Sequence, residues 1–410
     1  MKRITIIITI LLSLTGMTIF AQDVDMSFYI EEYNRPTATF LERLEVLEMV
    51  RDANLTGIGE FYHDALRFLL LRFPDIRTIE DRTAAEASAR ILAQGLAAER
   101  YIDAAADLWR LVENYDVARD INNGLVMQDA LIALGQIGAK DFVPHIALRL
   151  HVFNTDHTSD VETRRRFQRG IVGAINALET LQEPEGYRPV FFASLGWYDV
   201  AIRTMASVAL PNILEDPADI IIEIIRDPSS DPRVKYEAWR EMLRTNAPNE
   251  SKARVAAVAL EMGWLFSTSN LEFQRNLRSM RMSAIDAIRV FGVADDSVYG
   301  NLERSYRNSF VTTAPDYDEI RRTIATLSAS GSDQAVELLL SFLQELHGRR
   351  RVGPWGPRER QVMQMVIPAI GATGTQSLPV RQLLTTIQRS SDYTGAEQGW
   401  ARDALRALGF

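Results

Sequence analysis

The residue types best suited to hold a metal ion gather between positions 151 and 160. His151, Asp156, His157 and Asp160 could together offer imidazole and carboxylate ligands to zinc or another divalent ion. The six-residue step from His151 to His157 matches neither the spacing of a zinc finger nor the His-x-x-x-His face of a helical zinc enzyme. We therefore interpret this stretch as a polar connection and predict no metal site and no cofactor.

The sequence offers no recognisable catalytic nucleophile. It has no cysteine, and it lacks the Gly-x-Ser-x-Gly elbow, the Ser-x-x-Lys motif set and a glycine-rich phosphate loop. Carboxylates are common, but a general acid needs an apolar pocket that a sequence cannot display. We predict a non-catalytic protein. The alternative is an envelope enzyme, such as a hydrolase acting on cell-wall material in a groove of the fold.

Two basic clusters are candidates for binding. Arg164–Arg166 with Arg169 is expected to open a helix. The second cluster spans 348–360, where glycines and prolines predict a long connection that exposes a tryptophan among arginines. Arg and Trp dominate binding energy at protein interfaces, which makes this cluster a candidate partner-binding site. Its residues are Arg349, Arg350, Arg351, Trp355, Arg358 and Arg360. The alternative is a structural role, with Trp355 folded back on the neighbouring repeat and the arginines lying across a helix end.

Helices must position these residues, because apolar side chains recur at helical spacing along almost the whole chain. Short breaks separate segments of about a dozen to twenty residues. Examples are Asn54–Gly57, Asp216–Pro217 and Gly331–Asp333. The other tryptophans, Trp109, Trp197, Trp239, Trp264 and Trp400, have aliphatic neighbours and are expected in the core.

A six-residue motif recurs along the chain, with small residues three apart, then a large apolar residue and often glycine. Seven copies are present: Ala130–Gly135, Ala174–Glu179, Ala206–Pro211, Ala287–Gly292, Thr323–Ser328, Val366–Gly371 and Ala404–Gly409. A gap of 81 residues between Pro211 and Gly292 leaves room for two units, with Ala238–Leu243 as a degraded copy. Internal repetition of this kind is typical of a solenoid.

Helix packing explains the motif. Small residues let one helix approach its neighbour, the large residue fills the shared core, and a final glycine is expected to end the helix in the left-handed conformation. Asp141, Asp295 and Ser332 follow soon after and are expected to cap the next helix. Each helix pair leaves an apolar face that only the next pair covers, which predicts stacked antiparallel pairs.

The segment 133–144, Ala-Leu-Gly-Gln-Ile-Gly-Ala-Lys-Asp-Phe-Val-Pro, resembles a HEAT repeat of the short bacterial kind. The resemblance covers 125–410, while 37–124 is helical without the Leu-Gly turn and is expected to be a cap or divergent repeats. Pro211 and Ser328 depart from the pattern. The resemblance implies an all-α superhelix that works as a binding scaffold, and it carries over no catalytic residue.

The first residues predict export. Lys2 and Arg3 precede an apolar run that ends near Ala21, so we expect a signal peptide over 1–21 and a flexible segment over 22–36. An uncleaved anchor is the alternative. The periplasm is the expected location, with the cell surface or the exterior as alternatives.

The net charge of −9 argues against a nucleic-acid partner. Apart from the first residues, no stretch is long and apolar enough to cross a membrane. The expected function is an exported scaffold that binds other proteins through a concave face or through the connections between repeats, and self-association is a further possible use.

Overall fold

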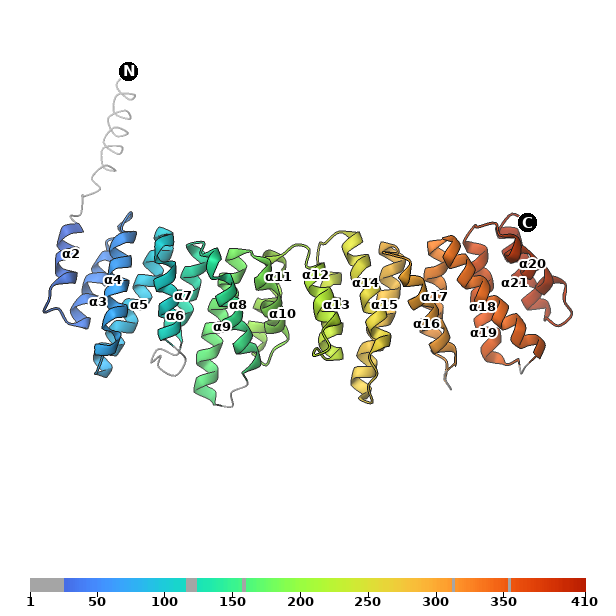
Figure 1. The fold of residues 1–410 in the computed structure, drawn as a ribbon, viewed down its shortest axis with the longest axis horizontal. Coiled ribbons are helices and arrows are strands. Elements are labelled where there is room, and N and C mark those ends of the chain that lie inside the picture. Colours follow the sequence, from blue (N-terminus) through green and yellow to red (C-terminus); the bar gives the residue numbers. More distant parts are fainter. Residues whose placement is uncertain (1–25, 116–123, 157–159, 312–313, 353–354) are drawn as a thin grey trace, which may run out of the picture. The chain divides into compact units, whose positions relative to one another are not determined.

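The computed structural model describes residues 26–115, 124–156, 160–311, 314–352 and 355–410 (Figure 1). These residues form α-helices and short 3-10 turns and contain no strand. The chain divides into two compact units, Met1–Ile213 and Leu214–Phe410. The predicted signal peptide over 1–21 lies outside the described residues.

In the described residues of the first unit, five α-helices precede the first motif copy and are followed by the pairs that carry the motif. They are α2 (Met26–Asn34), α3 (Phe40–Asp52), α4 (Gly59–Arg72), α5 (Ile79–Glu99), α6 (Ala105–Asn114), α7 (Leu125–Gln136), α8 (Val143–Thr155), α9 (Val161–Leu181), α10 (Tyr187–Leu195) and α11 (Val200–Ile213).

The second unit contains ten further helices in its described residues. They are α12 (Ala218–Arg226), α13 (Pro232–Arg244), α14 (Asn249–Leu265), α15 (Leu271–Phe291), α16 (Ser297–Val311), α17 (Tyr317–Ser330), α18 (Asp333–Val352), α19 (Pro357–Ala372), α20 (Leu378–Arg389) and α21 (Gly395–Ala407).

Each unit is built of two layers of helices. In the first unit α3, α5, α7, α9 and α11 pack successively against one another, and in the second α13, α15, α17, α19 and α21 do the same. We call these the motif layer, because all seven copies and the degraded copy at Ala238–Leu243 lie on its helices. The intervening helices form the companion layer. Within each unit, the predicted all-α, solenoid-like stack of helix pairs is confirmed.

Side-chain caps begin many of these helices. A Thr, Asp or Asn side chain accepts a hydrogen bond from a backbone N–H of the first helical turn, which satisfies a donor that the helix itself cannot. The residues that cap in this way are Thr39, Thr78, Asp160, Asp231, Asn270, Asp316 and Thr394. These caps fix where the chain turns into each helix, and so where the side chains of its first turn lie.

The four motif glycines divide between two roles. Gly292 and Gly409 have positive φ and follow the ends of α15 and α21, as expected. Gly135 and Gly371 lie inside α7 and α19, and the left-handed residues are Gly138 and Gly374, three positions later. A Cβ on Gly135 would lie 2.9 Å from the Cα of Ala177 in α9. At Gly135 and Gly371 the glycine is therefore needed for close approach of neighbouring motif helices rather than for ending the helix.

Two of the three expected caps after the motif are present. The Asp295 carboxylate accepts a hydrogen bond from the Ser297 backbone N–H at 2.8 Å, and Ser332 Oγ accepts one from the Ala335 N–H at 3.2 Å. Asp141 instead lies inside the 3-10 turn Lys140–Phe142, and α8 begins without a side-chain cap.

The N-terminal region is more ordered than the sequence suggests. Residues 22–36 were expected to be flexible, but Met26–Asn34 forms α2, which packs on α3. Tyr33 is buried, and its hydroxyl donates to the carbonyl of Ala65 at 3.2 Å. Downstream, α3–α6 form two further helix pairs that stack against α7.

The tryptophans are less buried than predicted. Trp239 is fully buried, whereas Trp109, Trp197, Trp264 and Trp400 are half-buried. The indole N–H of Trp264 donates to Ser305 Oγ at 2.7 Å, which shows how a polar tip stays satisfied at the boundary of the core. None of the described helices has the length and apolar character needed to span a membrane.

Candidate functional site

The predicted Arg-Trp cluster begins on a helix rather than in a long connection. Helix α18 continues to Val352, so Arg349, Arg350 and Arg351 occupy its last turn, and α19 begins at Pro357. Three successive helical residues point in different directions, about 100° apart. The arginines therefore separate onto different sides of the helix.

Arg350 is held in place by its neighbours. Its Nε donates to the carbonyl of Asp392 at 2.9 Å, and its guanidinium lies over the rings of Trp355, at 4.7 Å, and Tyr393, at 5.5 Å. Cation–π contacts on two rings and a hydrogen bond to the backbone fix this side chain between the α18–α19 and α20–α21 connections. Its position is thus a product of packing.

A pocket of about 520 Å³ opens beside Arg350, between the first turns of α19 and α21. We call it the Glu397 pocket. Two indoles line it, Trp355 and Trp400, together with polar side chains that end in planar groups. The latter are Arg350, Arg360, Gln361, Gln364 and Glu397.

Glu397 is fully buried, and its carboxylate is only partly used. Oε2 accepts a hydrogen bond from the backbone N–H of Thr394 at 2.7 Å and so completes a capping box for α21. Oε1 lies 3.7 Å from Arg360 Nε and accepts no hydrogen bond from any described residue. The Trp355 indole N–H is likewise buried and finds no acceptor among the described residues.

The remaining arginines of the predicted set do not join this pocket. Arg349 pairs with Glu345 at 2.9 Å and lies over the Phe310 ring, and Arg358 donates to the carbonyl of Phe310 at 3.5 Å. Arg351 is exposed. The structure brings Arg350, Trp355 and Arg360 together and places Arg349 and Arg358 on the side facing α16.

Sequence reasoning missed Glu397 and assigned Trp400 to the core. The repeat register offered a signal for both, because α21 packs on α19 in the motif layer. Residues near the start of one motif helix therefore face residues about one repeat earlier, as Glu397 faces Arg360. A glutamate three residues after a Thr cap, such as Glu397 after Thr394, marks a position where pairing with the preceding motif helix is expected.

A histidine of α18 contacts the same tyrosine as Arg350. His347 Nδ1 and the Tyr393 hydroxyl are 2.6 Å apart. Burial lowers the pKa of His347 below its usual value of 6.5, the charge of Arg351 lowers it further, and Asp392 opposes both. Burial also raises the pKa of Tyr393 to about 12. At neutral pH this pair is uncharged.

A larger pocket of about 730 Å³ lies two repeats earlier, between α14, α15 and α17. We call it the Glu319 pocket. Glu319 is buried, and its two oxygens accept hydrogen bonds from Arg281 Nε at 2.9 Å and Nη2 at 3.1 Å. Beside it, Arg278 Nη2 donates to Asp316 at 2.8 Å. This hydrogen bonding lowers the pKa of the Asp316 carboxyl below its usual value of 3.8.

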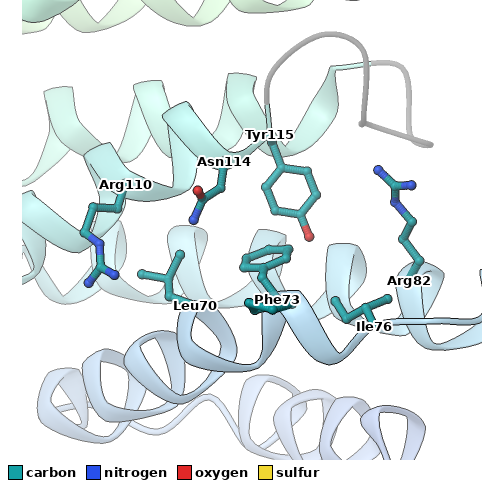
Figure 2. Close-up of a pocket in the computed structure, with 8 residues that line it drawn as sticks. Leu70, Phe73, Ile76, Arg82, Arg110, Asn114 and Tyr115 are labelled. Carbon is teal, nitrogen blue, oxygen red and sulfur yellow. The ribbon is translucent and has the colours of Figure 1, made fainter.

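The first unit contains a pocket of about 620 Å³ between α4 and α6 (Figure 2). Its floor is apolar, with Leu70, Ile76 and the ring of Phe73, which packs edge-on against Tyr115 at 4.8 Å. Its basic groups are paired, Arg110 with Asp107 at 3.0 Å and Arg82 with Glu86 at 3.5 Å. Fewer of its lining residues have polar side chains than in the Glu397 pocket.

The stretch tested for metal binding does not form a cluster in the described residues. His151 lies on α8, and the Asp160 carboxylate caps α9 by accepting from the Thr163 N–H at 2.7 Å. His157 lies outside the described residues. Among the residues that are described, no three His, Asp or Glu side chains come close enough to hold a metal ion.

The basic cluster Arg164–Arg166 lies in the first turns of α9, as expected. Arg164 lies over the Trp197 ring at 5.6 Å, Arg165 pairs with Glu162 at 3.6 Å, and Arg169 donates to Gln128 at 3.5 Å. Arg164, Arg165 and Arg169 are thus engaged within the first unit.

Comparison with known protein families finds no family model that matches this chain, and comparison with curated proteins finds no match either.

Proposed function

We propose that this chain is a non-catalytic, HEAT-like scaffold that binds another protein along one edge of its second unit. The edge is the one at which α14, α16 and α18 end and α15, α17 and α19 begin, the lower edge in Figure 1. We call it the Trp355 edge. Connections between repeats are a common binding surface of solenoid proteins.

The observation that carries the proposal is a row of exposed aliphatic side chains on this edge. Leu271 is 68% exposed, Val311 69% and Val352 91%, and Leu265 adds a fourth. Water-facing aliphatic side chains on successive connections favour a surface that another protein covers. The exposed Arg351 beside Val352 adds a residue type that is enriched at interfaces.

The proposal includes export. A signal peptide over 1–21 would deliver the scaffold to the periplasm or beyond, and cleavage after Ala21 would leave Gln22 as the first residue. The mass of the chain purified from a bacterial envelope checks this point. A mass that retains Met1–Ala21 would favour the anchored alternative.

Two leucines provide a matched test of the binding edge. Leu271 is the first residue of α15 on the Trp355 edge, and Leu378 is the first residue of α20 on the opposite edge, with 68% and 65% exposure. We expect Leu271→Ser combined with Val352→Ser to remove a partner that is captured by cross-linking from envelope extract. Leu378→Ser combined with Val290→Ser should leave the capture unchanged. Val290 is also 68% exposed, but it lies in the last turn of α15 on the opposite edge.

All four side chains are exposed, so neither double variant should disturb folding. Equal recovery of every cross-linked protein with both variants would contradict binding along the Trp355 edge. Loss with the control pair alone would move the interface to the opposite edge.

A further inference from the structure

The Glu397 pocket has two buried polar atoms with unused hydrogen-bonding capacity. Glu397 Oε1 is an acceptor without a donor, and Trp355 Nε1 is a donor without an acceptor, each judged among the described residues. A buried polar atom without a partner is unfavourable, because it has lost its hydrogen bonds to water and gained none in the protein. A ligand that meets both atoms therefore gains more than its contact area alone provides.

The charged groups of the pocket disfavour a carboxylate or an ammonium group at the Glu397 oxygen. A carboxylate would face the Glu397 oxygen that accepts no hydrogen bond, and it could not donate a hydrogen bond to that oxygen. An ammonium group could donate, but it would face Arg350 and Arg360, which lie 3.8 and 3.7 Å from the same carboxylate. The ligand that fits is neutral and carries donors and acceptors side by side.

The shape of the polar groups narrows the choice further. Arg360, Gln361, Gln364 and Glu397 all end in planar forks, which can engage two adjacent hydroxyl groups at once. A hydroxyl both donates and accepts, so neighbouring hydroxyls can satisfy Glu397 Oε1 and Trp355 Nε1 together. The indoles of Trp355 and Trp400 supply apolar wall for the C–H bonds of a sugar ring.

We propose that the Glu397 pocket is a binding site for a neutral saccharide. Its volume of about 520 Å³ lies within the range of small-ligand pockets. A peptide amide would present one N–H and one C=O, whereas the pocket presents four forked side chains, Glu397 among them, and the indole N–H of Trp355. The site lies on the same edge as the proposed protein-binding aliphatic side chains but is lined by none of them, and it adds a second activity to the scaffold.

The test uses the full chain on a glycan microarray of bacterial, plant and animal saccharides, followed by calorimetry with the best neutral oligosaccharide. We expect Glu397→Gln to weaken binding about tenfold or more, because the isosteric amide presents a donor or a weaker acceptor to the ligand. Glu397 also caps α21, so a second variant avoids the cap. Gln361→Ala with Gln364→Ala changes two exposed residues of α19 and should weaken binding several-fold without affecting folding.

Gln344→Ala with Gln382→Ala is the matched control, because these exposed helical glutamines lie outside the pocket. It should bind like the unmodified chain, as should Leu271→Ser, which separates this result from the protein-binding test. Absence of any saccharide signal, or equal affinity in the pocket and control variants, would overturn the proposal. Selection of a displayed peptide that depends on Glu397, with no saccharide bound, would assign the pocket to a protein partner instead.

Discussion

Two buried glutamates of the second unit occupy the same place in their helices but have different surroundings. Glu319 and Glu397 are each the third residue of a motif-layer helix, after the caps Asp316 and Thr394. Each faces an arginine of the preceding motif helix, Arg281 or Arg360. Equivalent positions in the repeat have thus become a closed ion pair in one pocket and a loosely paired carboxylate in the other.

The difference arises from what holds each arginine. Arg281 donates to the carbonyl of Gly263 at 3.0 Å and lies over the Trp264 ring at 3.8 Å, so its guanidinium reaches both oxygens of Glu319. Arg360 is 49% exposed and stays 3.7 Å from Glu397. The same buried glutamate position can therefore form a structural ion pair in one repeat and line a binding pocket in another.

Removing the two arginines should give the largest contrast. Arg281→Ala leaves Glu319 buried without its partner, and we expect a loss of about 3–5 kcal/mol in the free energy of unfolding. Arg360→Ala removes a half-exposed, distant partner and should cost about 0–1 kcal/mol. Urea unfolding followed by circular dichroism measures both. Similar losses in the free energy of unfolding for the two variants would refute the distinction between a structural ion pair and a binding pocket.

The close packing of α19 on α21 supports the Glu397 pocket, and a single methyl group should disturb it. A Cβ on Gly371 would lie 2.9 Å from the Cα of Ala404, and backbone cannot move aside as a flexible side chain can. We expect Gly371→Ala to destabilise the protein by about 1–3 kcal/mol and to weaken saccharide binding. Thermal unfolding and calorimetry provide the two readouts.

Gly300→Ala in α16 is the control for this substitution. An added Cβ there meets no atom within 4 Å, and alanine favours a helix over glycine by about 0.5–1 kcal/mol. This variant should be as stable as the unmodified chain or slightly more so. If Gly300→Ala destabilised the protein as much as Gly371→Ala, close approach would not be the reason for the glycine.

Acid should loosen the two pockets at different pH, which is the smallest effect we predict. The folded state lowers the pKa of His347, so the unfolded chain binds this proton more readily and stability near Tyr393 falls as the pH drops below about 6.5. Asp316 has a lowered pKa because Arg278 hydrogen-bonds its ionised form. Its contribution is present above its ordinary value of 3.8 and is lost as the pH falls below it.

Hydrogen exchange, corrected for intrinsic rates, follows this difference at each pH. Protection of the α20–α21 turn should decrease first, and protection of α17 only in stronger acid. His347→Gln should remove the early step and leave the later one. Simultaneous loss of protection in both regions would contradict the predicted order.

Repeat positions and helix caps follow from the sequence because they depend on neighbours along the chain. Within each unit the motif copies lie on the motif layer of helices, as a repeating apolar and small-residue pattern requires. Asp295 and Ser332 cap as expected, since a cap needs only the backbone N–H groups two or three residues later. Local chemistry therefore determined the all-helical fold and its repeat.

Tertiary packing decided the features that depend on residues a full repeat apart. The distances between helices that are about 40 residues apart in sequence decide two features. They determine whether Gly135 ends its helix or lets Ala177 pack against it, and whether an arginine reaches its glutamate. The arginines of the 348–360 cluster separated onto two sides because α18 extends to Val352. The sequence predicted that arginine and tryptophan would form the site. The stacking of the repeats determined which of these residues meet, because side-chain contacts between helices depend on the register of the stack.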